Sequence, residues 1–102
     1  MRYMLVIQWP ADSFGDIEDL INIEDMLIAR LPQECDVDGH DMGATQANIF
    51  VRTSDVDATF AALEAVFRET AEWREMKIAY RDAAGSNYTA LHPKTLQQFV
   101  VS

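Results

Sequence analysis

Apolar residues occupy both sides of the first segment, Tyr3–Trp9, when it is extended as a β-strand. A strand that is apolar on both faces is usually central in its sheet, so we expect a neighbouring strand on each edge. Pro10 ends the segment, because proline has no N–H to donate to the ladder of hydrogen bonds.

The next segment, Ser13–Leu31, has the 3.6-residue period of an amphipathic helix. We expect Ser13 to cap this helix, with Asp16 three residues later in a capping arrangement. Pro32 ends it, because the residue before a proline avoids the helical region. The predicted buried stripe consists of Ile17, Leu20, Ile21, Leu27, Ile28 and Leu31.

Glu24 interrupts this stripe, because it lies seven residues after Ile17 and four before Ile28. Two interpretations are open. A slight kink or the length of the side chain takes the carboxylate to water, or the carboxylate is held against the sheet by a partner such as an arginine. Ile23 and Met26 fall outside the predicted stripe.

Two more strands are predicted after the helix, at Glu34–Asp38 and Gln46–Thr53. The link between them contains Gly39 and Gly43, which indicates a hairpin with positive-φ positions or a β-bulge. The later strand alternates, with Ala47, Ile49 and Val51 on one side and Asn48, Phe50 and Arg52 on the other. This alternation is typical of a strand with one face on the core.

A second helix is predicted from a cap at Ser54 or Asp55 to about Ala71, because Val56, Phe60, Leu63 and Phe67 recur at helical spacing. A fourth strand, Glu75–Arg81, follows this helix.

The C-terminal part predicts a short strand at Tyr88–Leu91, which would form a hairpin with the fourth strand. A last short helix is expected from Pro93 to Phe99, because proline is well tolerated at the first helical position.

The order of these elements over residues 3–81 resembles that of a ferredoxin-like βαββαβ two-layer sandwich, an α+β fold. This resemblance implies an antiparallel sheet with both helices on one face, to which the C-terminal hairpin and short helix are added. The 102 residues suffice for one hydrophobic core, so we expect a single domain spanning residues 1–102. Element order implies no particular activity.

The sheet face without helices is expected to be open or covered by a partner. Alternation places on it Met4, Val6, Gln8, Asn48, Phe50, Arg52, Lys77, Ala79 and Arg81. Asp36, Asp38 and His40 would share this face, because alternate residues of a strand point the same way. Exposed surfaces of such mixed character commonly mark association sites, and we expect either a homodimer or a protein partner.

Acidic residues outnumber basic residues by 17 to 8, which gives a formal net charge of −9. Residues 1–41 hold ten acidic and two basic residues, so most of the excess lies there. Nucleic acids and anionic membranes are excluded as partners, because both bind clusters of lysine and arginine. The acidity indicates either a solvated surface or a basic protein partner.

The chain has one cysteine, Cys35, and no signal-peptide pattern. Its apolar stretches are shorter than the roughly 20 residues that span a bilayer. We therefore expect a cytoplasmic protein without an internal disulfide.

The glycine-containing link, Asp38–Gly43, and the following Asn48–Val51 resemble a segment of small uncharacterised bacterial proteins. This resemblance implies no established activity. In size and acidity the chain is also similar to some bacterial immunity proteins that neutralise toxins, which would imply a basic toxin as the partner.

The sequence contains few candidate metal ligands or catalytic residues. Asp36, Asp38 and His40 could hold a divalent metal, but acidic residues on an edge strand are also a routine protection against aggregation, so no metal or other cofactor is predicted. We find no phosphate-binding glycine loop and no nucleophile motif. A non-catalytic function is therefore favoured over an enzymatic one.

Two functions follow from these expectations. The first is a non-catalytic module that binds a basic protein or its own copy, with Phe50, Asp36 and Asp38 in the contact surface. The second is a small enzyme or anionic-ligand-binding protein on the open sheet face. In that case Arg52, Lys77 and Arg81 would receive the anion, while Asp38, His40 or Glu24 would exchange protons.

Overall fold

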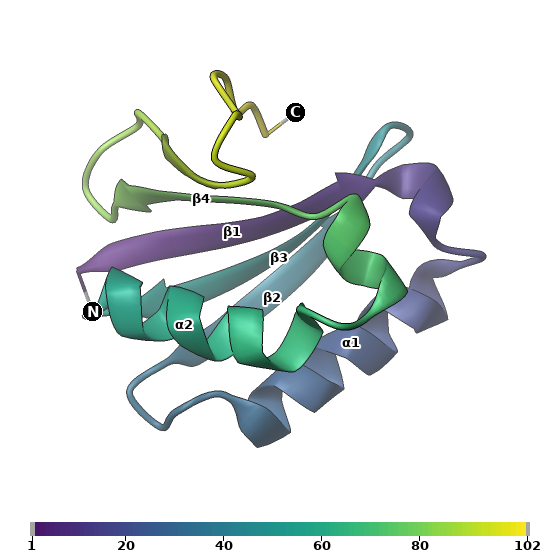
Figure 1. Ribbon diagram of the computed structural model, residues 1–102, viewed down its shortest axis with the longest axis horizontal. Helices are drawn as coiled ribbons and strands as arrows, with labels where there is room; N and C mark the ends of the chain where they lie inside the picture. Colours follow the sequence, from purple (N-terminus) through teal and green to yellow (C-terminus); the bar gives the residue numbers. More distant parts are fainter. Residues whose placement is uncertain (1, 102) are drawn as a thin grey trace.

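The computed structural model describes residues 2–101, which form an α+β fold of five strands and two α-helices (Figure 1). The strands are β1 (Tyr3–Pro10), β2 (Asp36–Met42), β3 (Gln46–Thr53), β4 (Lys77–Asp82) and β5 (Thr89–His92). The helices are α1 (Ile17–Arg30) and α2 (Val56–Phe67), with 3-10 turns η1 (Ala11–Ser13) and η2 (Ala71–Arg74). The α+β class and the predicted bounds of β3 are confirmed.

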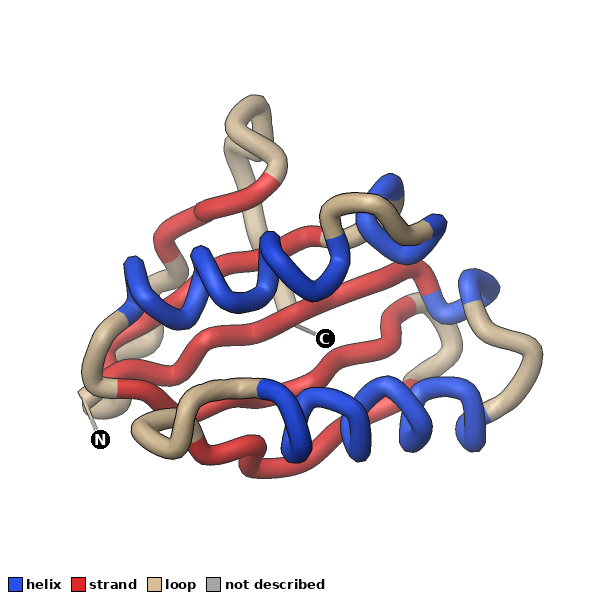
Figure 2. The backbone as a smooth tube through the Cα atoms, turned by 60° about the horizontal axis from the view of Figure 1, so that its bottom comes forward, coloured by secondary structure: helices blue, strands red, loops and turns tan. Residues whose placement is uncertain are grey.

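All strand pairs are antiparallel, and the order across the sheet is β2-β3-β1-β4-β5. The central position predicted for the first strand is confirmed, because β1 lies between β3 and β4. β5 extends the sheet beyond β4, so the strand order differs from that of a four-stranded ferredoxin-like sheet. Both helices cover the same face (Figure 2).

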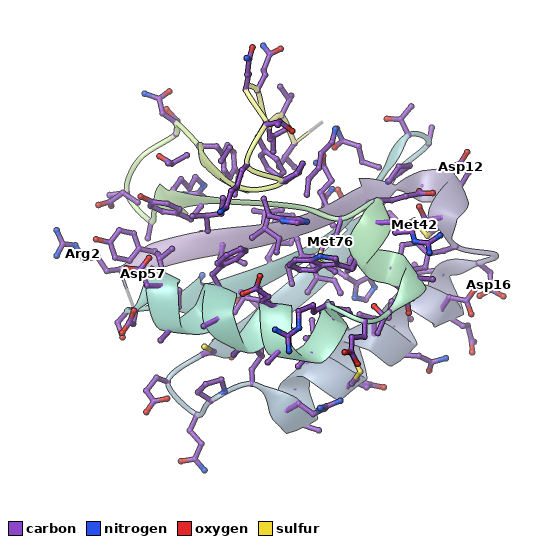
Figure 3. The ribbon with its side chains drawn as sticks, in the orientation of Figure 1. Arg2, Asp12, Asp16, Met42, Asp57 and Met76 are labelled. Atoms are coloured by element: carbon purple, nitrogen blue, oxygen red, sulfur yellow. The ribbon has the colours of Figure 1, made fainter. Side chains whose placement is uncertain are left out.

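The hydrophobic core lies between this face and the helices. β1 contributes Leu5, Ile7 and Trp9, all essentially inaccessible to solvent. The rest of the buried cluster comes from the other elements and consists of Leu20, Leu27, Ala47, Ile49, Val51, Leu63, Phe67, Met76 and Ile78. Figure 3 shows Met76 between the sheet and the helices. The residues predicted to face the helices are therefore in the core or, like Tyr80, packed against it.

The predicted stripe of α1 is wrong at its edges. Ile17 and Ile28 remain 46% and 60% exposed, whereas Ile23 and Met26 pack against the core. The buried side of α1 therefore includes Leu20, Ile23 and Leu27, and Glu24 makes a polar contact with β2 that is described below. The predicted cap at Ser13 is also wrong.

The N-cap of α1 is Asp16, whose carboxylate accepts hydrogen bonds from the backbone N–H groups of Glu18 and Asp19. Asp55 caps α2 in the same way by accepting from the N–H of Ala58. A side-chain oxygen at the cap compensates one of the helical N–H groups that has no partner within the helix. α2 ends at Phe67, earlier than predicted, and η2 follows after a short turn.

The helix predicted for Pro93–Phe99 is absent. After one turn closed by the N–H of Leu96 and the carbonyl of Pro93, the chain continues without regular structure. It lies over the sheet face opposite the helices (Figure 1). The carbonyl of Val100 accepts hydrogen bonds from the side-chain amides of Gln8 and Gln46, which fixes the segment in place. The face expected to be open is thus partly covered, and Val6 and Ala79 are buried.

A β-bulge in β2 changes which residues share a face. Val37 pairs with Val51, but Gly39 pairs with Phe50 and His40 with Ile49, so the register shifts at Asp38. Paired residues on neighbouring strands point to the same side of the sheet. His40 therefore faces the helices, and the prediction that it shares a face with Asp36 is wrong.

Gly39 has a φ of 142°, a backbone conformation that residues with a Cβ rarely adopt. A Cβ at this position would meet no atom within 4 Å, so the whole cost of Gly39→Ala is conformational. We expect this substitution to lower the free energy of unfolding by about 1–3 kcal/mol in urea titrations. Gly43→Ala, in the same hairpin without a positive φ, is the control and should cost less than about 1 kcal/mol. Equal losses for the two variants would contradict this explanation of the bulge.

Candidate functional site

Glu24 and His40 form the polar contact between α1 and β2. Nδ1 of His40 lies 3.1 Å from both carboxylate oxygens of Glu24. The Glu24 side chain is only 13% exposed and that of His40 is 28% exposed. Of the two interpretations of Glu24, the structure supports a carboxylate held against the sheet, with a histidine as its partner in place of the suggested arginine.

The basic residues predicted to receive an anion do not converge. Arg52 and Arg81 flank Met4 on the sheet, but each has other partners. Nε of Arg52 lies 3.4 Å from Asp38, while Nη1 of Arg81 donates to three carbonyls at the end of β4 and in the turn that follows. Lys77 lies at the opposite end of β4, level with Gln8.

The other predicted contact residues lie at the β2 edge. Asp36 is exposed and lies opposite Arg52, and Phe50 is half-buried opposite Gly39. Asp38, in the bulge, keeps its ion pair with Arg52. Asp36 lines a cavity at the end of α1, whereas Lys77 lines a different one at the end of β1.

Two side-chain amides, those of Gln8 and Asn48, lie beneath the C-terminal segment on the sheet face opposite the helices. The sequence predicted both residues on this face but no role for them. Nε2 of Gln8 donates to Oδ1 of Asn48 and to the carbonyl of Val100, each over 3.0 Å. Both amide side chains are buried. Gln8 thus provides a hydrogen-bond donor for the backbone carbonyl of Val100, while Asn48 orients the amide of Gln8.

A cavity of about 480 Å³ lies where η1, the first half of α1 and η2 meet. Its volume lies in the range of cavities that bind small molecules. Two aromatic residues, Trp9 and Phe14, and three carboxylates, Asp19, Glu72 and Glu75, contribute to its lining. None of these five residues was predicted as a site residue from the sequence.

Hydrogen bonds orient two of the carboxylates. Oγ of Ser13 donates to Oε2 of Glu75 over 2.6 Å, and the N–H of Gly15 donates to Oδ2 of Asp19 over 3.0 Å. Both bonds leave the second carboxylate oxygen available. Within residues 2–101, no lysine, arginine or histidine forms an ion pair with Asp19, Glu72 or Glu75.

The aromatic side chains of Trp9 and Phe14 contribute apolar surface to the cavity lining. The rings of Trp9 and Phe14 meet edge to face with their centroids 5.3 Å apart, and Trp9 meets Phe67 in a similar way at 6.2 Å. Nε1 of Trp9 donates to the carbonyl of Glu72, which ties η2 to the end of β1. Asp12 and Asp16 lie at the same end of the molecule, so the surroundings of the cavity are also acidic (Figure 3).

This arrangement suits a cationic group. Carboxylates with free oxygens bind ammonium or guanidinium groups through charge-assisted hydrogen bonds, and the partly exposed ring of Phe14 can add an attraction for a cation. In the sequence, the only indication of this site is that Trp9 precedes an acidic stretch. It could not show that Glu75, 62 residues after Ser13, would complete the site.

Neither a metal centre nor a membrane segment is found in the described part of the chain. Among residues 2–101, no three histidine, cysteine, aspartate or glutamate side chains gather closely enough to hold a metal ion. No helix in the same range has the length and apolar composition needed to cross a bilayer.

Comparison with known proteins gives no relative for this chain: no family model, curated protein or solved structure matches it.

His92 lies in an aromatic environment at the end of β5. Its ring stacks on Trp73 with centroids 4.0 Å apart, and the ring of Phe60 lies 6.4 Å away. Burial lowers the pKa of His92, and a hydrogen bond with the backbone of Trp73 and the charge of Glu64 oppose this only in part. The folded protein therefore favours the neutral imidazole.

This lowered pKa predicts a loss of stability in acid. Below the ordinary histidine pKa of about 6.5 the unfolded chain binds the proton more readily than the folded chain. The free energy of unfolding should fall as the pH drops from 7.5 through 6.5 toward the pKa of folded His92. In denaturant titrations, His92→Gln should flatten this pH dependence relative to wild type. An unchanged pH profile in His92→Gln would show that other groups cause it.

Proposed function

We propose that the protein is a non-catalytic module that binds a basic protein, and that the cavity at η1, α1 and η2 receives a lysine or arginine side chain of that partner. The observation that carries this proposal is the set of three carboxylates, Asp19, Glu72 and Glu75, around one cavity without a cationic partner among residues 2–101. Two of these carboxylates are already oriented by hydrogen bonds.

Pre-orientation favours binding, because less side-chain freedom is lost when the partner arrives. The net charge of −9 supports the same proposal by accelerating the encounter with a basic protein. A basic toxin, the partner expected for an immunity protein, has the required chemistry.

The other candidate functions receive less support. Arg52 and Arg81 already have partners within the fold. An anionic ligand on the sheet face would have to displace those partners from the two arginines. A homodimer through that face would form over the segment 93–101 that partly covers it. We regard residues 3–82 as a ferredoxin-like core extended by β5, and the cytoplasm as the expected location.

Calorimetric titration with a blocked hexa-arginine peptide tests the proposed function. Replacing Glu75 or Glu72 by glutamine removes one charge from the cavity but keeps the size of the side chain. Each substitution should weaken binding about tenfold or more, because a hydrogen bond between charged groups contributes roughly 1.5–3 kcal/mol. Raising the salt concentration should reduce the difference between variants.

Glu69→Gln is the matched control, because Glu69 is exposed and does not line the cavity. It changes the net charge by the same amount and should alter affinity less than about twofold. If Glu69→Gln weakens binding as much as Glu75→Gln, overall acidity alone explains the interaction and the cavity is not the site.

A further inference from the structure

A second cavity, of about 310 Å³, forms a groove between the last turns of α1 and the start of β2. Polar and apolar groups contribute equally to its walls, and the apolar side chains include Leu27, Ile28, Leu31 and Val37. Ile28 is 60% exposed, although it is a large apolar side chain. A groove with apolar side chains in its walls and an exposed isoleucine at its side can bury the apolar side chain of another molecule.

Carboxylates border this groove. Asp36 lines it, and Glu34 is exposed two residues before Asp36. The basic residue Arg30 is two positions after Ile28 and therefore projects from the opposite side of the helix. The groove thus combines apolar side chains in its walls with an acidic border formed by Glu34 and Asp36.

We infer that this groove binds a short segment of a protein partner in which an apolar side chain stands between lysine or arginine residues. The apolar side chain would pack against Ile28 and Val37, and the flanking basic residues would meet Glu34 and Asp36. A second copy of this chain fits poorly, because the same acidic border on both copies would repel. This inference rests on the proposed basic partner and adds a second contact surface for it.

The groove and the carboxylate cavity lie at opposite ends of α1. The cavity uses residues as far as Ile23, whereas the groove begins at Leu27. The 14 residues of α1 span about 21 Å, so one basic partner lying along this helix could reach both. Two linked contacts bind more tightly than either one alone.

NMR titration with a blocked peptide, Lys-Val-Lys-Leu-Lys-Val-Lys, tests the inference. The backbone amides of residues 27–37 should shift on addition of the peptide, and they should also shift in the Glu72→Gln/Glu75→Gln double variant. Ile28→Ala should weaken this binding about fivefold or more, because apolar contact area is lost. Val100→Ala shortens an exposed apolar side chain elsewhere and should leave affinity unchanged.

Three results would overturn the inference. A peptide with serine in place of valine and leucine that binds equally would show that charge alone acts. Shifts of residues 27–37 that depend on protein concentration without peptide would identify a second copy as the occupant. Shifts confined to residues 13–23 and 71–75 would place all binding in the carboxylate cavity. Conversely, shifts confined to residues 27–37 would support the groove while contradicting the proposed function.

Discussion

The burial of β1 on both faces is the constraint on which the rest of the structure depends. Leu5, Ile7 and Trp9 pack against the helices, and the alternate residues Val6 and Gln8 are buried on the other side. Such a strand needs a covering layer on each face. The helices provide one layer, and the C-terminal segment, fixed through the carbonyl of Val100, contributes to the other. Because both faces are occupied near β1, the accessible sites lie at the end of β1 and along the β2 edge.

The sequence predicted what local periodicity determines. The alternation in β3 and the two-sided apolar pattern of β1 gave their positions correctly. The buried side of α1 and the contact of Glu24 with His40 could not be predicted from helical periodicity alone. That contact depends in turn on one extra residue in β2, which turns His40 to the helix side. The carboxylate cavity was missed for the same reason, since Ser13 and Glu75 meet only through the tertiary fold.

Acidic residues of two kinds can be distinguished in the structure. Glu24 and Asp38 have partners within the fold, His40 and Arg52, and so contribute to its internal structure. Asp19, Glu72 and Glu75 form no such ion pair within residues 2–101, although they line one cavity. Like charges close together without a cation repel one another. This repulsion lowers the free energy of unfolding only slightly, because interactions between exposed charges are weak. Their arrangement is accounted for if a basic partner neutralises them.

The central claim is that these carboxylates serve binding and are not needed for folding. The most direct measurement is the free energy of unfolding of the variant Asp19→Asn/Glu72→Gln/Glu75→Gln, determined by denaturant titration at low and high salt. The amides can still accept the hydrogen bonds of Ser13 and Gly15. The account predicts that the variant is at least as stable as wild type at low salt and that any gain shrinks at high salt. A clear loss of stability at both salt concentrations would contradict it, because the carboxylates would then stabilise the fold itself.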